Sequence, residues 1–346
     1  MKINIFNKLF NSSRIFIIAE AGVNHNGDMK LAKKLIDCAF LAGCDAIKFQ
    51  TFKAENLVTQ SAAQAKYQKE NSPNKSQFEM LKKVELSEDN FIELFKYCRA
   101  KGIMFLSTPF DSESARFLNK LGMPIFKVSS GEVTNIPFLI QVASFKKPVI
   151  LSTGMSTLKE VKEAVHAIYS TGNKKLILLH CTSNYPASFK DVNLKAMDTL
   201  RTVFNVPVGY SDHTLEVEVA LAAVARGAFV IEKHITLDKT LPGPDHKASL
   251  DIDELKALVK MIRNIEVSLG DGVKAPVKSE AEVARVIRKS VVAGRNILPE
   301  EKLSWENLII KRPGNGINPK EIYKLIGKLA KREIKKDRLI KWSDVK

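Results

Sequence analysis

Short apolar runs alternate with amphipathic stretches along most of the chain. The runs are rich in β-branched and aromatic residues, which is typical of buried strands. The stretches between them have helical periodicity, and most end in glycine, a residue that favours a helix C-cap. The predicted strands cover residues 15–20, 46–52, 103–108, 125–130, 149–154, 176–182, 206–213 and 229–234. Because parallel strands need crossover helices, eight such units predict an α/β fold, the closed (β/α)8 or TIM barrel.

The repeating pattern stops after a helix predicted for residues 251–270. A polar segment containing glycine and proline follows, and we interpret residues 271–284 as a linker. From residue 285 the sequence changes to short strands and turns. We therefore expect a barrel domain over residues 1–270 and a small, mostly-β domain over residues 285–346, in a chain of 346 residues that is long enough for both.

The composition is that of an ordinary globular protein, with 45% hydrophobic and 27% charged residues. The net charge of +16 would suit nucleic acid, an anionic membrane surface or an anionic small molecule. The lysines are spread along the chain, however, without a helix-turn-helix, zinc-finger or aromatic RNA-binding pattern. The sequence therefore argues against nucleic acid and leaves an anionic small substrate, or simply a basic soluble protein.

The cysteines Cys38, Cys44, Cys98 and Cys181 lie in apolar contexts without C-x-x-C spacing, which predicts reduced thiols. The N-terminal segment lacks the long apolar core of a signal peptide, and no run approaches the length that spans a bilayer. We therefore expect a cytoplasmic protein that does not act at a membrane.

Polar residues gather where the predicted strands end, and in a TIM barrel the C-terminal strand ends form the active site. Side chains two positions apart, such as Glu232 and His234, share one face of a strand. The strand ends carry Glu20, Lys48, Gln50, Ser107, Thr108, Lys127, Ser129, Ser130, Ser152, Thr153, Thr182, Ser211, His213, Glu232 and His234. All of these strand ends can therefore contribute to one pocket.

Several chemistries fit these residue types. His213 and His234 can hold a divalent metal weakly, leaving positions for water and a substrate oxygen, or they can be ordinary hydrogen-bonded residues. Lys48 and Lys127, beside hydroxyl groups, suit a phosphate ester or carboxylate. A Schiff-base lysine, as in class I aldolases, is the alternative, and spacing does not decide between the two. Glu20 is the candidate general acid or base.

Ten phrases, spread in order over nearly the whole chain, resemble the sialic acid synthase family. They are "AEAGVNHNGD", "IKFQTF", "FLSTPFD", "KVSSGE", "LSTGM", "LHCTSNYP", "GYSDHT", "IEKHITLD", "GPDHKASL" and "KRPGNGI". The resemblance implies a TIM barrel followed by an antifreeze-like SAF domain. It also implies condensation of phosphoenolpyruvate with the open-chain aldehyde of an N-acetylmannosamine-type sugar, with release of phosphate.

The resemblance also implies roles for individual residues. His213 and His234 would hold Mn²⁺, Mg²⁺ or a similar ion that polarises the aldehyde oxygen, and Glu20 would act as acid or base. The residues expected to bind the two substrates are Lys48, Gln50, Thr108, Lys127, Ser130, Ser152, Tyr185, Ser211, Asp245 and Arg312. His246 and Lys247 have no implied role, and we expect both in a solvated loop.

Family members form dimers in which the C-terminal domain caps the neighbouring barrel. The resemblance therefore implies a domain-swapped homodimer in which Arg312, in "KRPGNGI", serves the active site of the partner subunit. Its guanidinium, always charged and fork-shaped, suits an oxygen of the sugar.

Three positions depart from the pattern of N-acetylneuraminate synthases. Phe49 and Phe52 stand where those enzymes commonly have histidine, and Ser183 stands where they commonly have asparagine. We expect these positions to lie near the substrates, and the differences favour the legionaminic acid branch, which uses a 6-deoxy sugar bearing two acetamido groups, over N-acetylmannosamine itself. A synthase that uses a phosphorylated aldose, or a non-catalytic carbohydrate-binding or ice-binding protein, are the alternatives.

Overall fold

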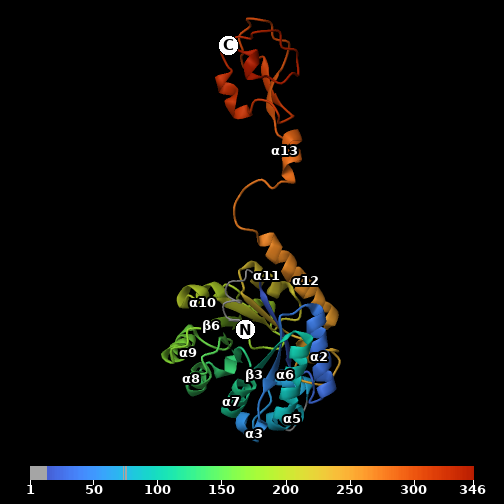
Figure 1. Cartoon of the computed structure of the whole chain (residues 1–346), viewed down its shortest axis with the longest axis vertical. Helices are drawn as coiled ribbons and strands as arrows, with labels where there is room; N and C mark the ends of the chain where they lie inside the picture. The colour runs from blue at the N-terminus through green and yellow to red at the C-terminus, as the bar shows by residue number, and fades with distance from the viewer. Residues whose placement is uncertain (1–13, 73, 75) are drawn as a thin grey trace. The chain divides into compact units, whose positions relative to one another are not determined.

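A computed structural model of the chain describes residues 14–72, 74 and 76–346. It divides into two compact units, Met1–Gly270 and Asp271–Lys346 (Figure 1). The first part of the N-terminal segment that we judged to lack a signal peptide, residues 1–13, lies outside the described residues. In the described part of the chain, no helix combines the length and the apolar character needed to cross a bilayer.

Within the described residues, the first unit contains one sheet of eight parallel strands. They are β1 (Phe16–Gly22), β2 (Ala46–Thr51), β3 (Met104–Pro109), β4 (Phe126–Val128), β5 (Val149–Ser152), β6 (Leu176–Cys181), β7 (Val208–Asp212) and β8 (Val230–His234). The strand order is β3-β2-β1-β8-β7-β6-β5-β4, and β3 packs against β4, which closes the sheet. The predicted TIM barrel is confirmed.

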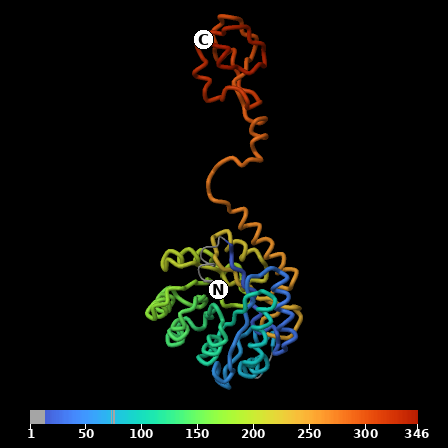
Figure 2. The backbone as a smooth tube through the Cα atoms, viewed as in Figure 1, coloured from blue at the N-terminus to red at the C-terminus, as the bar shows by residue number. Residues whose placement is uncertain are grey.

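Helices surround the strands (Figure 1). They are α2 (Met29–Ala42), α6 (Glu88–Lys101), α7 (Ser112–Leu121), α8 (Ile136–Ser144), α9 (Leu158–Ser170), α10 (Ala196–Phe204), α11 (Glu218–Ala225) and α12 (Ile252–Leu269). Helix α2 shows how the sequence sets their ends: Asp28 accepts two backbone hydrogen bonds at its start, and Gly43 ends it in the left-handed conformation. The last helix, α12, packs against the first, α2, so the ring of helices is closed as well (Figure 2).

An insertion between β2 and α6 carries three short helices, α3 (Ala54–Leu57), α4 (Lys66–Asn71) and α5 (Gln77–Val84). Its apolar side chains form a small core of their own, in which Met80 and Leu81 pack with Val23 and Phe52 of the barrel. These helices were not predicted from the sequence, because segments of this length show too few turns for a clear period.

Alternation along the strands sorts the barrel into two layers. Inward-facing apolar residues such as Ile18, Leu106 and Ile150 fill the barrel interior. Outward-facing ones, such as Ala19 and Phe49, pack in the larger core between strands and helices. Toward the carboxyl ends of the strands, the inward-facing residues become polar. A layer of polar side chains therefore lies next to the apolar interior of the barrel.

The first helix of the second unit is α13 (Glu280–Ile287), which crosses the boundary that we placed between residues 284 and 285. The antiparallel strands β9 (Ser290–Ala293) and β10 (Leu308–Lys311) follow, with an apolar core of their own. The predicted small C-terminal domain with β-structure is confirmed. The short 3-10 helices of the chain are η1 (Ser130–Glu132), η2 (Phe189–Asp191), η3 (His246–Ala248), η4 (Pro319–Lys324) and η5 (Trp342–Asp344).

Candidate active site

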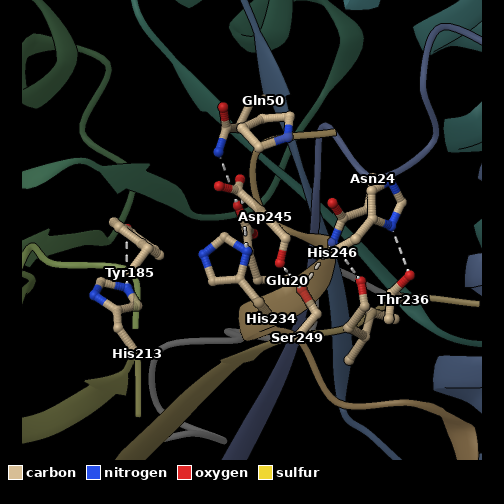
Figure 3. Close-up of polar contacts among 12 residues, drawn as sticks. Glu20, Asn24, Gln50, Tyr185, His213, His234, Thr236, Asp245, His246 and Ser249 are labelled. Atoms are coloured by element: carbon tan, nitrogen blue, oxygen red, sulfur yellow. Dashed lines mark hydrogen bonds and ion pairs between the residues drawn. The ribbon is translucent and has the colours of Figure 1, made fainter. Parts of the chain in front are cut away.

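A cavity of about 520 Å³ opens at the carboxyl ends of the strands. It is lined by all the barrel residues to which the resemblance gives a role: Glu20, Lys48, Gln50, Thr108, Lys127, Ser130, Ser152, Tyr185, Ser211, His213, His234 and Asp245. Of the other predicted strand-end residues, Ser129 and Glu232 line it, whereas Ser107, Thr153 and Thr182 do not. Figure 3 shows several of them converging from different strands. Arg312, by contrast, is an exposed residue of the second unit, directly after β10.

Two lysines and two carboxylates form the centre of the pocket. Lys48 Nζ lies 2.6 Å from Glu20 Oε2, 3.6 Å from Glu232 Oε2 and 3.1 Å from Thr108 Oγ1. Lys127 Nζ lies 3.6 Å from the other oxygen of Glu232. Glu232 thus bridges the two lysines, although the sequence analysis gave it no role. Its place two residues before His234, on the same strand face, is what put it among the predicted pocket residues.

The two carboxylates have opposite pKa shifts. Burial raises the pKa of Glu20 to about 7, with Lys48 opposing the shift. Burial acts in the same direction on Glu232, but the positive charges of Lys127 and Lys48 outweigh it and lower its pKa to about 2. At neutral pH Glu232 is therefore a fixed negative charge, whereas Glu20 can give or take a proton.

The lysines also differ. Burial disfavours the charged form of Lys48, yet the carboxylates of Glu20 and Glu232 raise its pKa above the usual value. Burial dominates at Lys127 and lowers its pKa, with Glu232 opposing the shift. When Glu20 is protonated, Glu232 is the carboxylate charge that faces the two lysines, and this balance favours an anionic substrate.

A group of hydroxyl and thiol side chains lies next to Lys127. Ser130 Oγ accepts a hydrogen bond from the backbone N–H of Gly154 and lies 3.2 Å from Cys181 Sγ. Ser152 Oγ is buried, and no hydrogen-bond partner for it is found among the described residues. Ser211 donates to Glu232 at 2.9 Å. The unpartnered hydroxyl of Ser152, at the end of β5, is therefore available to an oxygen of a ligand.

His213 directly follows β7 and His234 ends the neighbouring strand β8, and their ring centroids lie 5.6 Å apart. His213 Nδ1 lies 2.7 Å from the carbonyl oxygen of Thr182, which can only accept, so Nδ1 carries the proton and Nε2 keeps its lone pair. The hydroxyl of Tyr185 donates to that lone pair at 3.1 Å. His234 Nδ1 is buried, and no hydrogen-bond partner for it is found in the described part of the chain.

These histidines fit a metal ion by their chemistry. Burial lowers the pKa of His213 to about 4 and that of His234 well below its usual value, so both rings are neutral and can donate lone pairs. The carbonyl that orients His213 is the kind of outer partner that metal-binding imidazoles have. Residues 14–72, 74 and 76–346 contain no cluster of three or more His, Cys, Asp or Glu side chains arranged to hold a metal. The site would therefore depend on two imidazoles and remain open to solvent and substrate.

The insertion supplies a wall of the pocket that sequence reasoning missed. Tyr67 stacks against Tyr185 with ring centroids 5.3 Å apart, and Gln68 and Gln77 stand beside it. The apolar part of this wall consists of Leu57, Val58, Met80, Leu81 and Val84 of the insertion, together with Val23 and Phe110 of the barrel. No short motif marks these residues, because segments without a period bring them to the pocket.

Two expectations about individual residues were wrong. We expected Phe49 and Phe52 at the substrates, but neither lines the cavity. Phe49 points outward and stacks on Phe105, because Lys48 and Gln50 on either side of it face inward. Phe52 packs beneath the insertion. We also expected His246 in solvent, but it is completely buried, whereas Lys247 is exposed as expected. Ser183 does line the cavity.

The strand ends of this TIM barrel present paired lysines, carboxylates and histidines. These features are typical of barrel enzymes that act on anionic substrates. Comparison with known proteins identifies the family. The NeuB family matches residues 35–274, and the SAF domain matches residues 288–346. The chain belongs to the NeuB family and is an enzyme, and its resemblance to the sialic acid synthases is confirmed.

Individual relatives are similar over almost their whole length. The chain is 48% identical to the N,N'-diacetyllegionaminic acid synthase of Legionella pneumophila, over 99% of this chain and 98% of that protein. It is 50% identical to the Campylobacter jejuni enzyme of the same name, over 95% and 99%. The solved N-acetylneuraminic acid (sialic acid) synthetase of Leptospira borgpetersenii, in complex with citrate, has a TM-score of 0.71 and 38% identity, covering 78% of this chain and 90% of that one.

Proposed function

We propose that this enzyme condenses phosphoenolpyruvate with the open-chain form of an N-acylated mannose-type sugar. The carbon–carbon bond forms between C3 of phosphoenolpyruvate and the aldehyde carbon, water adds at C2, and the C2–O bond to phosphate breaks. The products are a nine-carbon α-keto acid and phosphate. The observation that carries the proposal is that a single pocket combines a cationic, hydroxyl-rich anion site with neutral histidines and a carboxyl group whose pKa is about 7.

The anion site suits phosphoenolpyruvate. Lys48 and Lys127 supply two positive charges, and Ser130, Ser152 and Ser211 supply hydroxyl donors. Charge-assisted hydrogen bonds of this kind bind carboxylate and phosphate oxygens and hold the leaving phosphate. Among the described residues lining the pocket, these two lysines are the cationic side chains. A second phosphate, on an aldose, would therefore lack a positive partner, which disfavours the phosphorylated-aldose alternative.

Glu20 is the residue that we assign to proton transfer at the sugar. The aldehyde oxygen gains negative charge as the carbon–carbon bond forms, and it needs a proton. With a pKa of about 7, Glu20 is partly protonated at neutral pH. The strand register places it opposite both Lys48 and His234, next to the histidine pair.

We further propose that His213 and His234 hold a divalent ion, Mn²⁺ or Mg²⁺. When bound, the ion supplies Lewis-acid polarisation of the aldehyde oxygen. Tyr185 covers the ring of His213, and its hydrogen bond to the Nε2 lone pair of His213 must break for the ion to bind there. Asp245, whose carboxylate lies 4.0 Å from His234, is assigned to the hydroxyl groups of the sugar.

Chelation is expected to abolish activity, and adding Mn²⁺ or Mg²⁺ is expected to restore it. Two imidazoles hold the ion, so its affinity should be modest and EDTA should remove it. The measurement is phosphate release from phosphoenolpyruvate and sugar, with the metal content determined in parallel. Undiminished phosphate release from protein shown to be metal-free would contradict the proposal.

The insertion wall supports the finer choice of sugar. An acetamido group presents a methyl group and an amide, which suit an apolar surface flanked by Gln68 and Gln77. A 6-deoxy sugar adds another methyl group that an apolar wall accepts at no desolvation cost. The names of the Legionella and Campylobacter relatives agree with this choice. We therefore propose 2,4-diacetamido-6-deoxymannose as the preferred acceptor.

The assay that tests the function is phosphate release with phosphoenolpyruvate and a panel of hexosamines. We expect 2,4-diacetamido-6-deoxymannose to have a kcat/KM about tenfold or more above that of N-acetylmannosamine, and phosphorylated aldoses to be inactive. Tyr67→Ala should reduce the ratio of kcat/KM for 2,4-diacetamido-6-deoxymannose to kcat/KM for N-acetylmannosamine. Each of the two sugars serves as the control for the other. The reverse order would exclude the insertion wall as the source of specificity, and phosphate release with none of the N-acyl sugars would exclude the function.

We also propose that the enzyme is a homodimer in which Arg312 of each subunit serves the pocket of the other. The support is the resemblance to the family, together with the exposure of Arg312 at the end of β10. A charged guanidinium in a small exposed domain suits recognition of a ligand held elsewhere.

A further inference from the structure

A buried histidine that the proposed reaction does not use joins two loops beside the active site. Nδ1 of His246 lies 2.7 Å from the hydroxyl of Thr236, and its Nε2 lies 3.2 Å from Oδ1 of Asn26. Thr236 follows β8, whereas Asn26 follows β1. Figure 3 shows His246 with Thr236 on one side and Asp245 on the other. The loops after the first and last strands of the barrel are therefore linked through one imidazole.

The hydrogen bonds assign the tautomer of His246. The amide nitrogen of Asn26 donates to the carbonyl oxygen of Pro242 at 2.9 Å, which turns Asn26 Oδ1 toward the ring. An amide oxygen only accepts, so Nε2 of His246 carries the proton. Burial lowers the pKa of His246 to about 4, so the ring is neutral at physiological pH, and Nδ1 is an acceptor. This imidazole is therefore a fixed structural link and not a proton donor for catalysis.

The loop backbone packs directly against this hydrogen bond. Gly243 has a φ of +155°, and a Cβ there would lie 2.6 Å from His246 Cδ2 and 3.0 Å from Asn26 Oδ1. The first contact is closer than real Cβ atoms tolerate, and the second would require Asn26 to move, so the loop favours glycine at position 243. The "GPDH" sequence thus provides, in order, the close approach of the backbone, Asp245 and the histidine that holds the loop.

The same loop carries Asp245 into the pocket. Its carboxylate is buried, and the side-chain partner found for it among the described residues, His234, is 4.0 Å away, beyond hydrogen-bonding distance. Its main-chain oxygen accepts a 2.6 Å hydrogen bond from Ser249, which in turn accepts one from Asn24 at 2.9 Å. The main chain on either side of Asp245 therefore sets the direction of its carboxylate.

We propose that Asn26, Thr236 and His246 form a clasp that positions Asp245 for the sugar. His246 is then a positioning residue, which acts through the backbone that it shares with Asp245 and not by touching a substrate. The proposal rests on the proposed function, which assigns Asp245 to the sugar. The phosphoenolpyruvate residues Lys48 and Lys127 lie on other strands, β2 and β4. Loss of the clasp should therefore weaken use of the sugar and leave use of phosphoenolpyruvate unchanged.

Steady-state kinetics of clasp variants test this proposal. His246→Ala and the milder Asn26→Ala should each raise the KM for the sugar about tenfold, because misplaced binding groups lose most of their contribution. The KM for phosphoenolpyruvate should not change. His246→Gln, which keeps an amide N–H to donate to Asn26, should recover most of the loss. Lys247→Ala, at the exposed neighbouring position, is the matched control and should behave as wild type.

A double-mutant cycle separates positioning from general stability. If the clasp acts through the carboxylate of Asp245, adding His246→Ala to Asp245→Asn should cause little further loss of kcat/KM for the sugar. Fully additive losses, or equal rises in both KM values, would overturn the proposal. A fall in thermal stability with unchanged KM values would also overturn it.

Hydrogen exchange tests the clasp without any substrate. In the wild-type enzyme we expect slow exchange over residues 237–250, faster exchange in His246→Ala and Asn26→Ala, and recovery in His246→Gln. Unchanged exchange in both alanine variants would refute the clasp even if the reaction proceeds as proposed. Conversely, the alanine variants could exchange faster while the wild-type enzyme releases no phosphate with any N-acyl sugar. That result would support the clasp and refute the proposed function.

Discussion

His213→Ala and His234→Ala are each expected to abolish turnover, with kcat falling at least about 1,000-fold. Each substitution removes one of the two imidazoles proposed to hold the metal, and a single imidazole cannot hold it in place. Bound Mn²⁺, measured by electron paramagnetic resonance, should fall together with activity. The fold should persist, because these residues stand at the strand ends, above the apolar layers that stabilise the barrel.

His166→Ala is the matched control for both variants. His166 is exposed on α9, on the outside of the barrel, so its loss should change neither metal binding nor phosphate release. Circular dichroism and the midpoint of thermal unfolding verify that each variant is folded. A folded His234→Ala enzyme that kept both bound Mn²⁺ and wild-type kcat would show that the histidines serve another purpose.

Strand alternation explains why so much of the site could be predicted. In parallel strands of one barrel, inward-facing residues at the carboxyl ends must meet, whatever their separation in sequence. Glu20, Lys48 and His234 come from three strands, yet the register makes them neighbours. The same rule, applied to Phe49, predicts that it faces away from Lys48 and out of the pocket, as the structure shows. Our expectation for Phe49 followed the family resemblance instead.

The parts that could not be predicted lie in loops and short helices, which show no period to interpret. His246 is separated from its partner Asn26 by 220 positions, and no feature of either segment indicates that they meet. Tyr67 reaches the pocket on α4, a helix too short to produce a periodic signal. Loop residues are placed by tertiary hydrogen bonds and packing, which local sequence patterns do not encode.

Mixing two inactive variants, His234→Ala and Arg312→Ala, is expected to restore activity if Arg312 serves the partner subunit. After dissociation and reassembly of equal amounts, half of the dimers contain one chain of each kind. In a mixed dimer, the barrel that keeps His234 receives Arg312 from the other chain, so one of its two sites is complete. About a quarter of wild-type activity should then return, measured as phosphate release.

Capping within one subunit predicts a different result. Every barrel with an intact His234 would then carry its own Arg312→Ala domain, and every intact Arg312 would face a barrel that lacks its metal ligand. Mixing would restore no activity, and that outcome would exclude the arrangement in which Arg312 crosses the dimer. Mixing His234→Ala with His213→Ala is the matched control, because both changes damage the barrel and neither arrangement can then produce a complete site.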